Sequence, residues 1–94
     1  MRNIKITELA GIFGTNIVVM FVPGRNPKWY AHFEDSDTKD GPSDHFLCGT
    51  TGDGNTANEA INDYAKRIAG RVVVLHAGSE NRKEFNCPKE VDGI

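Results

Sequence analysis

The segment Gly49–Thr56 (GTTGDGNT) gathers hydroxyl, carboxylate and amide side chains directly before a predicted helix. Free backbone N–H groups at the start of a helix can hold an anion, so this segment is a candidate phosphate site. The residues we assign to a nucleotide-type ligand are Trp29, Tyr30, Thr50, Thr51, Asp53, Asn55 and Arg71. The segment has neither the P-loop lysine nor a G-x-G-x-x-G pattern, and turn and cap requirements explain its residues equally well.

A second candidate is the acidic segment Asp35–Asp44 (DSDTKDGPSD). Its partner-binding candidates are Asp35, Asp37, Asp40 and Asp44. Carboxylates on a tight turn can bind calcium, but their spacing departs by one residue from the EF-hand pattern. Phe46 also stands where the bidentate glutamate belongs. We therefore expect a solvated acidic loop, a surface that suits a basic protein partner.

Histidine and cysteine form a third set of reactive side chains, namely His32, His45, Cys48, His76 and Cys87. His45 and Cys48 have H-x-x-C spacing, but a structural zinc site needs four ligands and no C-x-x-C pair anchors one here. Nothing places either cysteine beside a base, as a Cys–His nucleophile pair requires. We expect no catalytic residue, no metal and no cofactor.

The best-defined element is a helix that begins at Thr56 and ends near Gly70. Thr56 and Glu59 form the T-x-x-E capping box, which satisfies backbone N–H groups at the helix start. Apolar residues recur at helical spacing on one face, namely Ala57, Ala60, Ile61, Tyr64, Ala65 and Ile68. Gly70 suits the left-handed residue that commonly ends a helix.

Several apolar runs predict strands. Asn16–Val22 (NIVVMFV) is β-branched and apolar throughout, which predicts a central strand covered on both faces. Lys28–Glu34 follows as its partner, with Trp29, Ala31 and Phe33 on one face and Tyr30 and His32 on the other. The other predicted extended segments are Ile4–Ile6, His45–Thr50, Arg71–Ala77 and an edge strand at Lys83–Cys87.

The remaining segments predict turns or irregular chain. Thr7–Gly14 fits one helical turn or an irregular connection, and Gly52–Asn55 is expected to break the extended chain. Lys89–Ile94 is expected to fray. The order predicts one α+β domain over residues 1–94 with its core at about 16–88. In it, an antiparallel sheet of about three to five strands (β-β-β-α-β) carries one main helix on one face. The uncovered face favours a homodimer or higher oligomer.

Composition narrows the class of protein. The chain has 94 residues, 38% hydrophobic content and a formal net charge of −2. Nucleic-acid binding needs clustered Lys and Arg, so we do not expect it. The most apolar stretch, Ile12–Val22, is interrupted by Gly14 and Asn16, which indicates neither a membrane span nor a signal peptide. We expect a cytoplasmic protein with two reduced cysteines.

The segment Thr51–Ile61 (TGDGNTANEAI), with the predicted strand order, resembles the HicB-like antitoxin domain. The residues at its turn and helix positions are Gly52, Asp53, Thr56, Glu59, Ala60 and Ile61. Arg82, Glu84 and Pro88 are similar to the basic stretch and proline that close that module, so the resemblance covers about residues 16–88. Two departures are the inserted Gly54 and Asn55 and the longer acidic loop. Few residues follow Pro88, so we expect the partner-binding module without the DNA-binding extension that members commonly carry.

The resemblance implies a non-enzymatic module, of phage or mobile-element origin, that neutralises or regulates a toxin-like protein or host factor by occluding it. The alternative from the residues is a small oligomeric protein that sequesters a nucleotide-type ligand. A metal-dependent nuclease using Asp35, Asp37 and His45 is the least favoured of the three.

Overall fold

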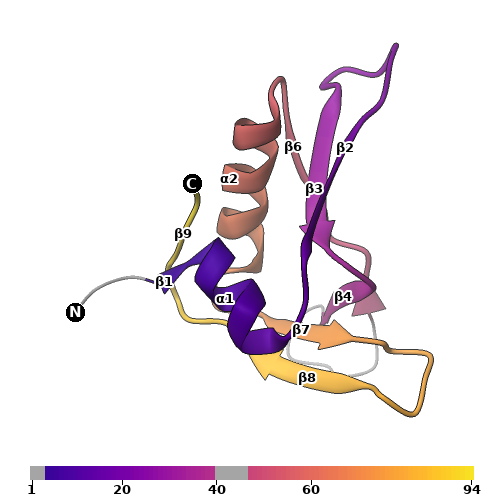
Figure 1. The fold of residues 1–94 in the computed structure, drawn as a ribbon, viewed down its shortest axis with the longest axis vertical. Coiled ribbons are helices and arrows are strands. Elements are labelled where there is room, and N and C mark those ends of the chain that lie inside the picture. The colour runs from indigo at the N-terminus through magenta and orange to yellow at the C-terminus, as the bar shows by residue number, and fades with distance from the viewer. Residues whose placement is uncertain (1–3, 40–46) are drawn as a thin grey trace.

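The computed structural model describes residues 4–39 and 47–94, which form a mixed α+β fold (Figure 1). In chain order the elements are β1 (Ile4–Lys5), α1 (Ile6–Phe13), β2 (Ile17–Phe21), β3 (Trp29–Phe33), β4 (Ser36–Lys39), β5 (Leu47–Cys48), β6 (Gly52–Gly54), α2 (Ala57–Ile68), β7 (Val72–Leu75), β8 (Lys83–Asn86) and β9 (Val91–Asp92). The predicted α+β class is confirmed. No helix within the described ranges is long and apolar enough to cross a membrane.

The strands divide into separate sheets. One is antiparallel in the order β2–β3–β6, a second is antiparallel in the order β5–β4–β7–β8, and β1 pairs with β9 in parallel. The second antiparallel sheet lies across one end of the first in Figure 1. The chain changes direction between β3 and β4 at Asp35, whose φ of 48° is left-handed. This turn sends β4 into the second sheet.

Helix α2 has the predicted start and the predicted buried face. The Thr56 hydroxyl accepts a hydrogen bond from the Glu59 N–H at 3.1 Å, and the Glu59 carboxylate accepts one from the Asn55 N–H at 2.8 Å. The residues buried on this helix are Ala60, Ile61, Tyr64, Ala65 and Ile68. Gly70 has a φ of 74°, as expected for a left-handed residue after a helix.

Strand β6 is a segment that we predicted to be a break. Cβ atoms added at Gly52 would collide with the backbone of Tyr64 and Ala60, and at Gly54 with that of Ala60. Glycine in a strand allows another backbone to approach closely, so helix α2 lies directly on β6. The G-D-G sequence is therefore needed for helix–sheet contact, although it is also typical of a turn.

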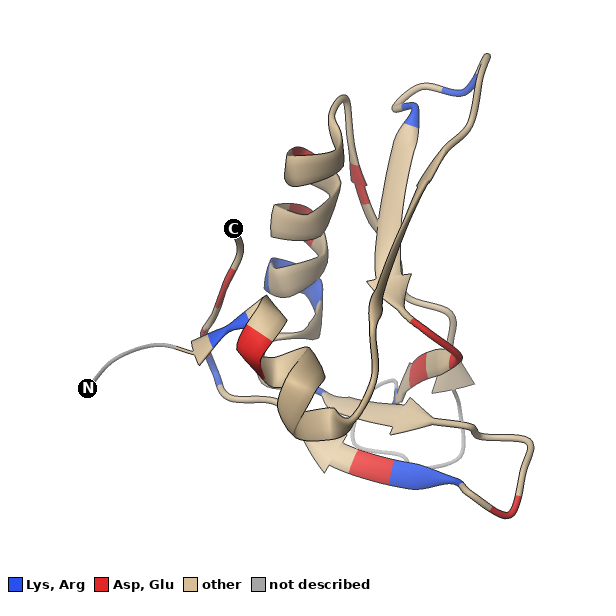
Figure 2. Cartoon of the chain, viewed as in Figure 1, with Lys and Arg blue, Asp and Glu red and all other residues tan. Residues whose placement is uncertain are grey.

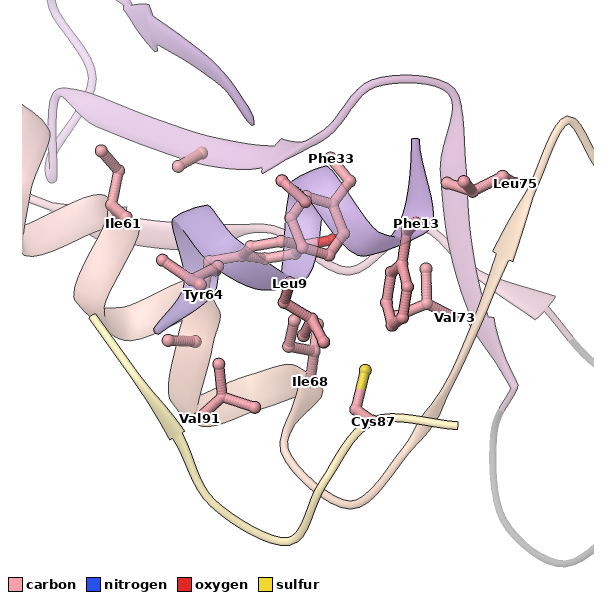
Figure 3. Packing of buried hydrophobic residues seen from close by; sticks show 14 of the residues in the cluster. Leu9, Phe13, Phe33, Ile61, Tyr64, Ile68, Val73, Leu75, Cys87 and Val91 are labelled. Carbon is pink, nitrogen blue, oxygen red and sulfur yellow. The ribbon is translucent and has the colours of Figure 1, made fainter. Parts of the chain in front are cut away.

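Helix α1 and the C-terminal strand complete the core, contrary to two predictions. Thr7–Gly14 lies within or directly after a helix of eight residues, which buries Ile6, Leu9, Ala10 and Phe13. Lys89–Ile94 was expected to fray, but Val91 is buried and the Ile94 N–H donates to Asn62 Oδ1 at 2.8 Å. Both segments are held by apolar side chains that pack among the residues of α2 and β7 (Figure 3).

Aromatic rings connect the two sheets through this core. Phe13 stacks on Phe85 with ring centroids 4.3 Å apart, and it meets Phe33 edge-on at 6.0 Å. Phe33 in turn meets Tyr64 at 5.2 Å with perpendicular planes. Offset and edge-to-face pairs of this kind add stabilisation beyond the buried area itself. Burial also raises the pKa of the Tyr64 hydroxyl, so that group is neutral at physiological pH.

Strand β4 corrects the prediction of a polar loop at Asp35–Asp44. Ser36–Lys39 pairs with both β5 and β7, while residues 40–44 lie outside the described residues. Its one fully buried polar side chain, Thr38, has its hydroxyl 2.6 Å from the hydroxyl of Thr50. A polar strand is tolerated inside the sheet because its buried hydroxyl is hydrogen-bonded.

Strand β2 corrects a further prediction, because it is not central. In the described part of the chain it pairs with β3 alone. Met20 is 45% exposed and Phe21 is 48% exposed. Apolar composition predicted burial on both faces, whereas among the described residues one edge of β2 has no neighbouring strand.

The glycine contact predicts the effect of a single methyl group. We expect Gly52→Ala to lower the free energy of unfolding by about 3 kcal/mol or more, because its Cβ would strike helix backbone that cannot yield as a side chain would. Gly49→Ala is the matched control, since a Cβ there meets nothing within 4 Å. Urea unfolding measures both variants, and equal stabilities would contradict the contact.

Candidate functional site

The three-stranded sheet has one face against α2 and one face that no described element covers (Figure 1). Strand alternation and register place a defined set of side chains on the uncovered side. We call this the outer face, and its members are Val18, Met20, Tyr30, His32 and Asp53, with Arg25 from the loop between β2 and β3.

Contacts on the outer face hold the Tyr30 ring in one position. Its hydroxyl donates to the Met20 sulfur at 2.9 Å, and its ring stacks on His32 at 5.9 Å between centroids. The Arg25 guanidinium lies 5.4 Å from the Tyr30 ring centroid and 2.7 Å from Asp53 Oδ1. A cation over an aromatic face and a carboxylate beside that cation fix both side chains. The ring is therefore preorganised and reachable from solvent.

A hollow of about 260 Å³ lies at the C-terminal end of α2. Its described lining is Gly49, Thr50, Thr51, Arg67 and Arg71. Arg67 is bonded to Asp63 at 2.7 Å, whereas the Arg71 guanidinium has no hydrogen-bond or ion-pair partner in the described part of the chain. Guanidinium and hydroxyl donors together suit an oxyanion such as a phosphate group. We call this hollow the Arg67–Arg71 pocket.

The structure brings together only part of the predicted ligand-binding set. Thr50, Thr51 and Arg71 line the Arg67–Arg71 pocket. Tyr30 lies on the outer face instead. Asp53 reaches both places, because one carboxylate oxygen lies 2.7 Å from Arg25 and the other lies 3.9 Å from Arg67. The other two take structural positions, since Trp29 packs against Phe21 at 5.1 Å and the Asn55 N–H joins the helix cap.

Sequence reasoning missed Arg67 as a lining residue. Lys66, Arg67 and Arg71 group at the end of the helix, a position that also complements the helix dipole. The spacing of four residues between Arg67 and Arg71 was the available indication. That spacing does not reveal that Gly49–Thr51, which is distant in the sequence, lies opposite the two arginines in the fold.

The predicted acidic partner surface is not a cluster among the described residues. Asp35 accepts a hydrogen bond from His76 Nδ1 at 2.8 Å, and Asp37 lies within β4 opposite Val74. Asp40 and Asp44 lie outside the described residues. Acidic and basic positions are both spread over several elements of the described chain (Figure 2).

One ion-paired arrangement joins β4 to β8. Glu84 lies 2.6 Å from the Lys39 ammonium and 2.9 Å from the Arg82 guanidinium. Hydrogen bonds from Lys39 and Arg82 lower the pKa of the Glu84 carboxyl. The arrangement joins two cations to one carboxylate at a largely exposed site, so it adds little to stability.

The histidine and cysteine side chains are dispersed. Within the described ranges, no three His, Cys, Asp or Glu side chains are grouped to hold a metal ion. Cys48 and Cys87 are free thiols, and burial raises the pKa of Cys87 to about 11. That thiol is protonated at neutral pH, a state that does not act as a nucleophile. His45 lies outside the described residues.

Comparisons with family models, curated proteins and solved structures found no match to this chain. Function is therefore inferred from the outer face and the Arg67–Arg71 pocket, and the HicB-like resemblance stays a prediction.

Proposed function

We propose that the chain is a non-enzymatic protein-binding module that contacts its partner through the outer face. The observation that carries this proposal is the uncovered, preorganised group of Met20, Tyr30 and His32 on β2 and β3. Tyrosine is enriched among the residues that dominate binding energy, and methionine adapts its shape to a partner surface. The Arg25–Asp53 ion pair beside them supplies a polar rim.

The resemblance to HicB-like antitoxins gives the proposal a class of partner. In this reading the module acts in the cytoplasm as a homodimer or higher oligomer, and it neutralises a toxin-like protein or host factor by occlusion. A phage or other mobile element would encode it. Occlusion needs a rigid contact surface and no chemistry, which is what the fixed Tyr30 ring offers.

Partner binding predicts a loss of affinity when Tyr30 is truncated. The tagged chain is purified with the products of its neighbouring genes, and Kd for the retained protein is measured by calorimetry. We expect Tyr30→Ala to weaken binding about 30-fold, the effect of losing about 2 kcal/mol at a central aromatic contact.

The matched control is Ile12→Ala, which truncates a residue that is 65% exposed on α1, away from the outer face. It should bind as the unmodified chain does. Retention of full affinity by Tyr30→Ala, or a complex in which only Ile12→Ala weakens binding, would contradict the proposal. Thermal unfolding of both variants shows that neither result comes from loss of fold.

The Arg67–Arg71 pocket supports a second candidate function, the sequestration of a nucleotide-type ligand. Three residues of the predicted ligand-binding set meet there, and the Arg71 guanidinium is unpartnered in the described part of the chain. The volume of about 260 Å³ accepts a phosphate group with part of the attached molecule.

Pyrophosphate and AMP are suitable probes for this pocket. If it binds them, Arg71→Gln should lower the affinity about tenfold or more, because a charge-assisted hydrogen bond contributes about 1.5–3 kcal/mol. Lys66→Gln removes a neighbouring positive charge that does not line the pocket, so it should have little effect. Equal losses in the two variants, measured by calorimetry, would indicate nonspecific attraction and contradict the site.

A further inference from the structure

The free edge of β2 has none of the features that usually prevent strand edges from pairing. The strand reads Ile-Val-Val-Met-Phe, with no charged residue, proline or glycine. In the described chain its second edge faces no other strand (Figure 1). Natural proteins protect such edges with lysine, proline, bulges or a covering element. An unprotected apolar edge of this length indicates pairing with another strand.

The hydrogen bonds to β3 determine which backbone groups point outward. The Val22 N–H donates to the Lys28 carbonyl at 2.7 Å, and the Glu34 N–H donates to the Asn16 carbonyl at 2.9 Å. In an antiparallel pair, bonded residues alternate with residues whose N–H and C=O groups point away. The outward residues of β2 are therefore Ile17, Val19 and Phe21.

We propose that β2 pairs antiparallel with β2 of a second copy of this chain, in a register centred on Val19. Val19 then lies opposite Val19 of the second copy, and Ile17 lies opposite Phe21 of the second copy. Each opposed pair exchanges both backbone hydrogen bonds, so every outward N–H and C=O of β2 is satisfied.

Two shifted registers would also place outward-pointing residues of β2 opposite each other. The residues that flank β2 exclude both of them. A shift of one step places Phe21 opposite Thr15, whose N–H already donates to the Ala10 carbonyl at 2.9 Å. The opposite shift places Ile17 opposite Pro23, which has no N–H. Only the register centred on Val19 satisfies all of the outward groups, which makes the edge complementary to itself.

Side chains support the same pairing. On the outer face, Met20 would lie beside Val18 of the second copy, and on the helix side Phe21 would lie beside Ile17 of the second copy. This covers Met20 and Phe21, two of the most exposed large apolar residues in the described chain. No charged side chain of β2 opposes another, so pairing costs no like-charge repulsion.

The symmetry of the pair gives a continuous sheet in the order β6–β3–β2–β2–β3–β6. The two-fold axis of an antiparallel pair is perpendicular to the sheet, so both copies of α2 lie on one side and both outer faces on the other. The joined outer faces form one larger surface. The use of that surface for partner binding rests on the proposed function, whereas the pairing of two copies does not. Experiments on the pairing therefore need no partner protein.

Sedimentation equilibrium tests the assembly. The unmodified chain should sediment as a dimer of 10.3 kDa protomers, and Phe21→Lys should raise the dimer Kd about tenfold or more by placing a charge at the edge. Ile12→Lys makes the same change at an exposed site on α1 and should leave the dimer Kd unchanged. A monomer at every concentration, or equal effects of the two variants, would overturn the proposal.

Disulfide trapping tests the register. Val18→Cys and Met20→Cys are prepared separately in a Cys48→Ser background and then mixed and oxidised. The mixture should give a disulfide-linked dimer in higher yield than either protein alone, because residue 18 faces residue 20 of the second copy at about 4.5–5.5 Å between Cβ atoms. Equal yields from the mixture and the single proteins, or no linked dimer, would overturn the register.

Discussion

The direct contact of the α2 backbone with the glycines of β6 is the constraint on which the rest of the structure depends. At Gly52 there is no room for a side chain between α2 and β6, because an added Cβ would collide with the α2 backbone. This close contact sets the distance and the position of α2 relative to the sheet. That position sets the buried face of α2 and places Tyr64 against Phe33. Among the described elements, no helix lies on the opposite side of the β2–β3–β6 sheet.

The two antiparallel sheets contribute to the core in different ways. The β5–β4–β7–β8 sheet buries Thr38, Val73 and Leu75, and its edge strand β8 packs Phe85 against Phe13. The β2–β3–β6 sheet buries only the residues that face α2. Its outer side chains contact one another around Tyr30, and in the described part of the chain the second edge of β2 pairs with no strand. The uncovered outer face and the free edge of β2 both follow from the way α2 packs on this sheet.

The sequence predicted the parts of the fold that depend on local interactions. The cap at Thr56, the apolar face of α2 and the pairing of β2 with β3 require only neighbouring residues or alternation, and each was found. The strand at Gly52–Gly54 was missed because glycine and aspartate are typical of turns, and only the position of α2 makes glycine necessary there. Similarly, Val91 anchors the last residues through a contact with the core that no local pattern reveals.

The sequence likewise predicted part of the candidate site and missed the rest. Thr50, Thr51 and Arg71 were selected by residue type, and they line one pocket because the second sheet brings the chain before β6 to the end of α2. Trp29 and Asn55 were selected by the same reasoning but take part in packing and capping. Residue type shows which side chains can bind a ligand, whereas the fold decides which of them meet.

Strand β2 has one edge bonded to β3 and one free edge, and the proposed assembly uses the free edge. Amide hydrogen exchange along β2, followed by NMR at increasing protein concentration, tests this claim most directly. The N–H groups of Val18 and Met20 should be protected at every concentration, while those of Ile17, Val19 and Phe21 should become protected as the concentration rises. Exchange of these three at the rate of exposed amides throughout would contradict the account.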